Sequence, residues 1–134
     1  MGLLLHPSEI LYQGDNMIVQ NEKIILNKRP VGFPREDDFK IVSEKIESIN
    51  YGEVIIEILW LSLDPYMRGR MSEAKSYALP IKIGEVITGG AVGKVVVSNC
   101  PNYKIGEIVE GFTLGWQKYA KTTTKYIRRV DSTL

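Results

Sequence analysis

The sequence contains a single cysteine, Cys100, and a single histidine, His6. One cysteine cannot form an internal disulfide, which is consistent with a reducing compartment, so we expect a cytoplasmic protein. One cysteine and one histidine cannot supply the four ligands of a structural zinc site, so we expect no zinc. A nucleophilic cysteine would need a histidine partner, and the only histidine lies among the first few residues.

No run of eighteen apolar residues is present, so no segment is long enough to cross a membrane as a helix. Residues 1–7 also lack the basic region and the long apolar stretch of a signal peptide. The 17 basic and 16 acidic residues leave a formal charge of +1. This balance argues against binding to nucleic acid or to an anionic membrane surface.

One local cluster of basic residues is present near the end of the chain. We expect it to form a solvated strand face rather than a track for phosphates. Its members are Lys118, Lys121, Lys125, Arg128 and Arg129.

The sequence also lacks any long stretch with a helical period of 3.6 residues. Short extended segments recur instead at a spacing of roughly ten residues, with turn signals between them. This pattern predicts a mostly β fold, a barrel or sandwich with one or two short helical turns, and no βαβ unit for a dinucleotide. The expected strands are 17–26, 39–46, 53–63, 81–87, 94–97, 105–111, 115–122 and 125–130.

A length of 134 residues suffices for one domain with a sizeable core and is too short for two. Residues 1–16 show no periodicity that continues into the later pattern. We therefore expect a leader or an added extension over residues 1–16, with Met17 as a plausible start. The remaining residues, 17–134, are expected to form one domain.

The most informative stretch is Leu61–Met71, which follows the longest apolar strand of the pattern. Pro65 ends that strand, because its ring removes a backbone donor and biases Asp64 away from a helical conformation. The polar side chains of Tyr66 and Arg68 thus gather at the end of a buried element, which is a common way to present a site.

The same residues allow a purely structural interpretation. Asp64 would cap one helical turn, Pro65 would occupy its first position, and Met67 and Met71 would face the core. As a functional group, the Tyr66 hydroxyl could bind a substrate carbonyl. Likewise, Arg68 could hold a carboxylate or phosphate. Asp64 is a more plausible cap than base, and the tryptophans at 60 and 116 are expected to be core or half-buried packing residues.

A glycine-rich segment, Gly89–Lys94, resembles a phosphate-binding loop only superficially. The spacing of its glycines is wrong, and strands are expected on both sides, so no helix N-terminus would be available to a phosphate. Adjacent glycines in a strand indicate either a β-bulge or the close approach of a ligand, and both alternatives stay open here.

Several collinear blocks together resemble the zinc-independent medium-chain reductases, in the branch of prostaglandin reductase and leukotriene B4 dehydrogenase. The resemblance extends from about Glu22 to Val130. The blocks are 27–34 with 38–39, 61–71, 84–97, 103–109 and 115–120.

The resemblance implies a GroES-like, partly open β-barrel, the N-terminal part of an NADPH-dependent oxidoreductase. Members of that family reduce the carbon–carbon double bond of enals and enones, and hydride passes from the nicotinamide to the β-carbon. Some relatives carry an aromatic residue where this chain has Gly90, so its substrate pocket would be wider. The residues expected to line substrate and cofactor are Asp64, Pro65, Tyr66, Met67, Arg68, Gly89 and Gly90.

The family continues into a Rossmann domain, which these 134 residues do not contain. We therefore expect neither tight NADPH binding nor turnover by this chain alone, and no catalytic residue within it. The alternative function is a free-standing barrel that acts as a binding or assembly module, and an oligonucleotide-binding barrel is a third. Strand edges exposed in an incomplete barrel would favour self-association, for example as a homodimer.

Overall fold

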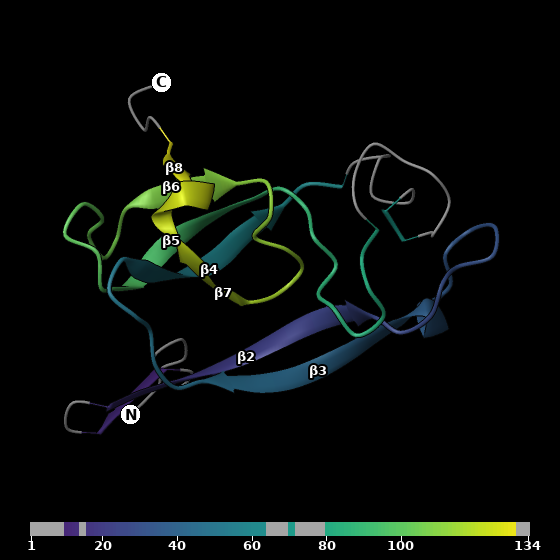
Figure 1. Ribbon diagram of the computed structural model, residues 1–134, viewed down its shortest axis with the longest axis horizontal. Helices are drawn as coiled ribbons and strands as arrows, with labels where there is room; N and C mark the ends of the chain where they lie inside the picture. The colour runs from purple at the N-terminus through teal and green to yellow at the C-terminus, as the bar shows by residue number, and fades with distance from the viewer. Residues whose placement is uncertain (1–9, 14–15, 64–69, 72–79, 131–134) are drawn as a thin grey trace.

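The computed structural model describes residues 10–13, 16–63, 70–71 and 80–130. The chain folds into two antiparallel sheets, and the long β2–β3 hairpin runs along one side of the second sheet (Figure 1). The strands are β1 (Ile10–Gln13), β2 (Asn16–Leu26), β3 (Phe39–Ile46), β4 (Glu53–Leu61), β5 (Ala91–Ser98), β6 (Ile108–Gly111), β7 (Tyr119–Thr123) and β8 (Arg128–Arg129). Within the described ranges there are also two 3-10 turns, η2 (Glu36–Asp38) and η3 (Thr124–Tyr126), and Arg70 is helical.

The first sheet has the order β1-β2-β3, and its two longer strands confirm the sequence prediction for 17–26 and 39–46. Val19 pairs with Ile46 at one end of the β2–β3 ladder. Strand β1 lies within the segment that was expected to be a leader or extension, and it pairs with the start of β2. Whether residues 1–16 are an extension stays a prediction.

The second sheet has the order β7-β4-β5-β6-β8, with all neighbours antiparallel. Strand β4 lies inside this sheet and is the longest apolar strand, as predicted, although it ends at Leu61 rather than at residue 63. Its register against β5 shifts between Ile55 and Ile56 and again between Ile58 and Trp60. Irregularities of this kind typically bend a strand and increase its local twist.

Four predicted strands are shorter in the structure or missing. Residues 81–87 form no strand and contribute one isolated bridge, because Gly84 adopts a φ of 93° and turns the chain. A φ of 100° at Gly106 likewise delays β6 to Ile108. The strand predicted for 115–122 is β7, which begins later, and the one predicted for 125–130 is reduced to η3 and β8.

The mostly β fold with short helical turns is confirmed, and its core divides into three clusters. One lies within the five-stranded sheet, one between the two sheets, and one beneath the loops that follow β4. Met71, expected on the core side, is 4% exposed in the third cluster, where Trp116 packs half-buried against Phe39. In the part of the chain that the structure describes, none of the helical segments has the length and apolar character needed to cross a bilayer.

A buried polar link joins the two sheets. Asn21 of β2 is 2% exposed, its amide nitrogen donates to Gln117 Oε1 at 2.9 Å, and its Oδ1 accepts from the Tyr119 backbone N–H at 2.9 Å. Gln117 in turn donates to the Leu114 carbonyl at 2.8 Å. Because each of these groups would be costly to bury unpaired, the link fixes how β2 sits against β7.

Strand β8 is only two residues long, and its residue Arg129 contacts the preceding loop in three ways. Arg129 Nε lies 2.6 Å from Glu107 Oε2, its guanidinium lies 4.2 Å from the centre of the Tyr103 ring, and it also donates to the Asn102 carbonyl. The Lys104 backbone N–H, which donates to Glu107 Oε1, lowers the pKa of that carboxyl most, and Arg129 lowers it further.

We predict that Asn21→Ala lowers the free energy of unfolding by about 1–3 kcal/mol, since it removes the acceptor of the Tyr119 N–H and the donor to Gln117 Oε1. Urea denaturation of the purified chain measures this change. Gln20→Ala, at an exposed position on the same strand, serves as the control and is expected to change stability by less than about 0.5 kcal/mol. Equal effects of the two variants would contradict the structural role of Asn21.

We also predict a pH-dependent contribution from Glu107. A carboxyl whose pKa is lower in the folded chain stabilises the fold above its ordinary pKa of 4.5, and this contribution is lost as the pH falls through the lowered value. Melting temperatures should therefore separate wild type from Glu107→Gln at neutral pH and converge in acid. Glu47→Gln, at an exposed position, should show no comparable convergence.

Candidate functional site

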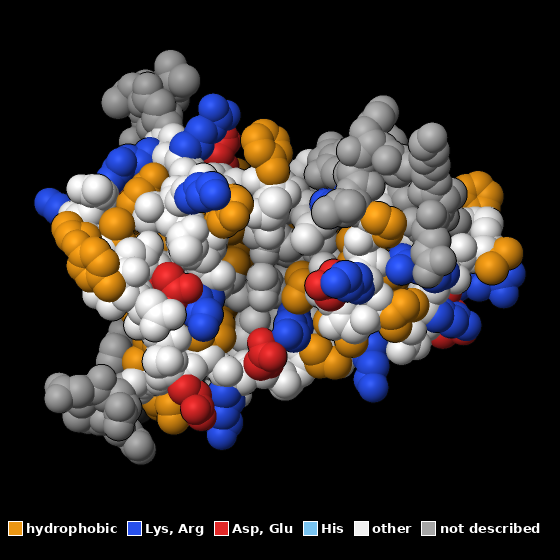
Figure 2. All heavy atoms as spheres, in the orientation of Figure 1, with side chains coloured by type: hydrophobic (Ala, Val, Ile, Leu, Met, Phe, Trp, Pro, Cys, Tyr) orange, Lys and Arg blue, Asp and Glu red, His pale blue; other side chains and the backbone are white. Residues whose placement is uncertain are grey.

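A groove of about 640 Å³ crosses one end of the five-stranded sheet. It is lined by the ends of neighbouring strands and by the loops that join them. Hydrophobic side chains and lysine or arginine side chains are interspersed over the region of β6 and β8 (Figure 2). The lining residues are Trp60, Leu61, Ser62, Gly90, Ala91, Val92, Glu110, Gly111, Phe112, Thr113, Lys125, Tyr126, Ile127 and Arg128.

The apolar wall of the groove results from the unequal burial of β4. Strand β7 pairs with β4 only from Glu53 to Glu57, and the first half of β4 is buried there. Beyond that point Trp60 is 73% exposed and Leu61 43% exposed. The expectation that Trp60 is a core or half-buried packing residue is therefore wrong, because no described strand flanks this end of β4 on the β7 side. Trp60 is instead one of the residues that line the groove.

The predicted glycine pair lies at the edge of the groove. The Gly90 carbonyl accepts from the Ser62 N–H at 2.8 Å, and the Gly89 carbonyl accepts from the Gly115 N–H at 3.2 Å. The pair is not a bulge between two strands, because β5 begins only at Ala91 and the irregular register lies in β4. A Cβ placed on Gly90 would lie 3.6 Å from Ser62 Cβ and 4.0 Å from Phe112 Cδ1, so a side chain here would narrow the groove.

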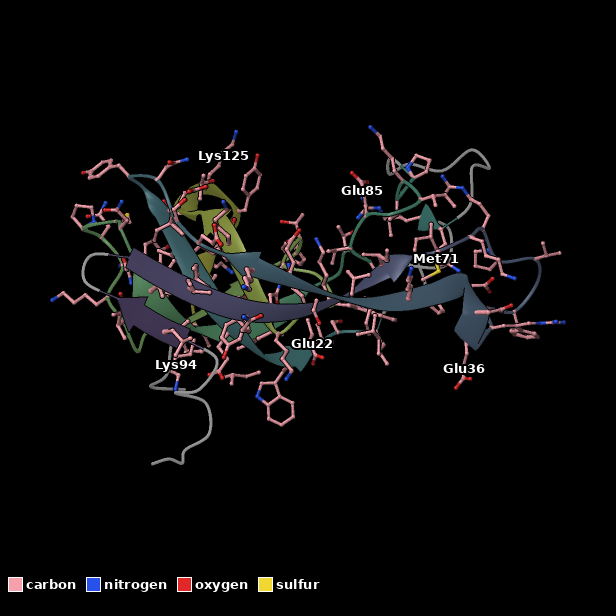
Figure 3. The ribbon with its side chains drawn as sticks, turned by 90° about the horizontal axis from the view of Figure 1, so that it is seen from below. Glu22, Glu36, Met71, Glu85, Lys94 and Lys125 are labelled. Carbon is pink, nitrogen blue, oxygen red and sulfur yellow. The ribbon has the colours of Figure 1, made fainter. Side chains whose placement is uncertain are left out.

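Charged residues line the opposite part of the groove. Arg128 engages Glu110 through two nitrogens, with Nε and Nη2 at 2.9 and 2.8 Å from the same carboxylate oxygen. The Lys125 ammonium lies 5.5 Å from the centre of the Tyr126 ring, and in Figure 3 its side chain extends outward from the ribbon. The basic cluster expected to form a solvated strand face thus contributes two residues to a groove.

The remaining predicted site residues, Asp64 to Arg68, lie outside the described residues, and so does most of the predicted corner. The far end of that corner is described and firmly held. Arg70 donates to the Thr88 hydroxyl at 2.6 Å, next to the glycine pair, and Met71 is buried. The Met71 carbonyl accepts from Arg29 at 3.0 Å. Both ends of the corner are therefore anchored near residues 88–90.

Sequence reasoning missed Phe112, Thr113 and Tyr126. Phe112 is 78% exposed and Tyr126 52% exposed, and no spacing in the sequence sets them apart from the core residues. They meet only because β6 lies between β5 and β8, an order that the sequence pattern does not reveal.

The described residues do not fit the pyrophosphate of NADPH. That group is commonly held at the N-terminus of a helix, next to a glycine-rich turn. In residues 10–13, 16–63, 70–71 and 80–130, the helical residues are two three-residue 3-10 turns and Arg70, so no α-helix N-terminus lies in these ranges, and the glycine pair leads into a strand. Within the same ranges, no group of three or more histidine, cysteine, aspartate or glutamate residues could hold a metal ion.

The glycines of this region differ in a way that can be tested. A Cβ on Gly93 would overlap the Glu57 carbonyl oxygen and lie 2.5 Å from Ile56 Cγ2, whereas Gly90 has room for one. We predict that Gly93→Ala destabilises the chain by about 1–3 kcal/mol and Gly90→Ala by less than about 0.5 kcal/mol. Urea denaturation measures both, and a larger effect at Gly90 would contradict the geometry.

Comparisons with known proteins place the chain among oxidoreductases. The chain is 43% identical over 100 residues to an NADPH-dependent curcumin reductase from Escherichia coli, which covers 75% of this chain and 29% of the relative. It is 38% identical to a 2-alkenal reductase (NADP(+)-dependent) from Nicotiana tabacum, over 78% of this chain and 32% of that protein. The chain thus spans about a third of the length of these relatives.

A solved structure supports the same relationship. The crystal structure of CurA from Vibrio vulnificus in complex with NADPH matches with a TM-score of 0.71 and 46% sequence identity, over 75% of this chain and 30% of that one. Residues 22–130, most of the chain, match the family described as the N-terminal domain of oxidoreductase. The chain therefore belongs to the oxidoreductase N-terminal domain family.

Proposed function

We propose that this chain is the substrate-side domain of an NADPH-dependent reductase that acts on the carbon–carbon double bond of enals and enones. The observation that carries the proposal is the apolar groove, which adjoins Gly90 and the start of the Leu61–Met71 corner. Its size is typical of a site for a small molecule. Relatives named as curcumin and alkenal reductases support the substrate class.

The groove residues suit a conjugated carbonyl compound. Trp60 and Phe112 present large aromatic surfaces, on which a flat conjugated system can stack. Thr113 lines the groove and carries a hydroxyl that can donate a hydrogen bond to a carbonyl oxygen. By the resemblance, Tyr66 would supply a second such donor, and Asp64 to Arg68 would complete the wall.

We further propose that the chain binds NADPH weakly and does not turn over by itself. The mismatch between the described residues and a pyrophosphate supports this, as does the chain's length of about a third of its relatives. The hydride donor would then be held by a further domain, and this chain would position the substrate and exclude water from it.

A domain exchange tests the proposed function. The chain replaces the matching N-terminal region of the E. coli curcumin reductase, and NADPH consumption is followed with a panel of enals and enones. We predict NADPH-dependent reduction by the chimera and none by the isolated chain. Within the chimera, Tyr66→Phe should lower kcat/KM by about 3- to 10-fold through the loss of one hydrogen bond.

The control for this experiment is Tyr51→Phe, which alters a tyrosine that is 78% exposed in a turn away from the groove and should leave kcat/KM unchanged. A folded, NADPH-binding chimera that reduces none of the panel would contradict the proposed substrate class. A fluorescence titration that gave the isolated chain a micromolar affinity for NADPH would contradict the proposed need for a further domain.

A further inference from the structure

The side chains that line the groove include two positive charges and one negative charge. Arg128 and Glu110 form a two-pronged ion pair, so that the charge of each is largely satisfied by the other. Lys125 forms no ion pair with any residue in the described ranges, and its ammonium rests near the ring of Tyr126, another lining residue. The lining residues therefore carry one excess positive charge beside an aromatic wall.

The groove is also elongated. It crosses the ends of β4, β5, β6 and β8, which are neighbours in that order. Adjacent strands lie about 4.8 Å apart, so three spacings give a span of about 14 Å from the Trp60 side to the Lys125 side. A short enal would occupy only part of this length, whereas a conjugated molecule with an aromatic ring could extend across it.

We propose that Lys125 selects among substrates, and that the groove prefers elongated conjugated carbonyl compounds with an anionic group at the Lys125 end. This inference rests on the proposed function and narrows its substrate class. The aromatic side chains stack on the conjugated part, and the ammonium pairs with a carboxylate. The positive net charge of the groove favours a ligand with a free carboxylate over the corresponding uncharged ester.

Binding to the intact 134-residue chain tests the preference directly. The probes are 4-carboxybenzylideneacetone and its methyl ester, which share the conjugated enone and differ in charge. Tryptophan fluorescence reports binding, because Trp60 lines the groove and Trp116 packs half-buried in another cluster. Trp60→Phe leaves only Trp116 as a fluorophore and should abolish most of the quenching, which shows that the signal comes from the groove.

We expect the acid to bind about 2- to 5-fold more tightly than the ester, the range typical of an exposed ion pair, and the difference to shrink with added salt. Lys125→Gln should bring the ratio close to one. Lys121→Gln, which removes an exposed lysine of β7 outside the groove, should preserve it. Equal affinities for acid and ester in the wild-type chain, or a ratio unchanged by Lys125→Gln, would overturn the inference.

The two proposals fail in different ways. If the chimera reduces both probes but Lys125→Gln does not alter the ratio of their kcat/KM values, the reductase function stands and the role of Lys125 is refuted. If the isolated chain shows the preference for the acid but the chimera reduces neither probe, the role of Lys125 in binding stands and the reductase function is refuted. Absence of quenching by either probe overturns the inference as well.

Discussion

The organisation of this domain depends on the pairing of β4. Its first half lies between β5 and β7 and carries fully buried aliphatic side chains, including Ile55 and Ile56. Its second half keeps β5 on one side and loses β7 on the other. An apolar strand that is covered at one end only must expose apolar surface at the other, and that surface forms one wall of the groove.

The surrounding structure fixes this arrangement from two directions. The link from Asn21 through Gln117 to the Leu114 carbonyl positions the first sheet against the second. A shift of one sheet relative to the other would leave buried polar groups without hydrogen bonds, which is energetically costly. On the far side, Gly93 allows β5 to lie against β4 without a side chain between them. The groove is therefore built on well-packed strands, which favours a pre-formed rather than an induced site.

The groove lies in a chain that belongs to the oxidoreductase N-terminal domain family. A domain that covers about a third of the length of its reductase relatives supplies an apolar groove, while the described residues include no α-helix N-terminus for a dinucleotide. Under the proposed function, substrate selection would belong to this chain and cofactor chemistry to a further domain. In the inferred specificity, Arg128 is paired with Glu110 whereas Lys125 remains available to an anionic ligand group.

The sequence by itself determined the mostly β class, the positions of β2, β3 and β4, the burial of Met71 and the family. These features depend on local patterns: alternation within a strand, proline and glycine between strands, and blocks of characteristic residues in order. The exposure of Trp60, the loss of the strand at 81–87 and the meeting of Phe112, Tyr126 and Lys125 were decided only by the tertiary structure. The physical reason is that burial of a strand residue depends on which strands flank it, and a local sequence pattern does not specify the order of strands in a sheet.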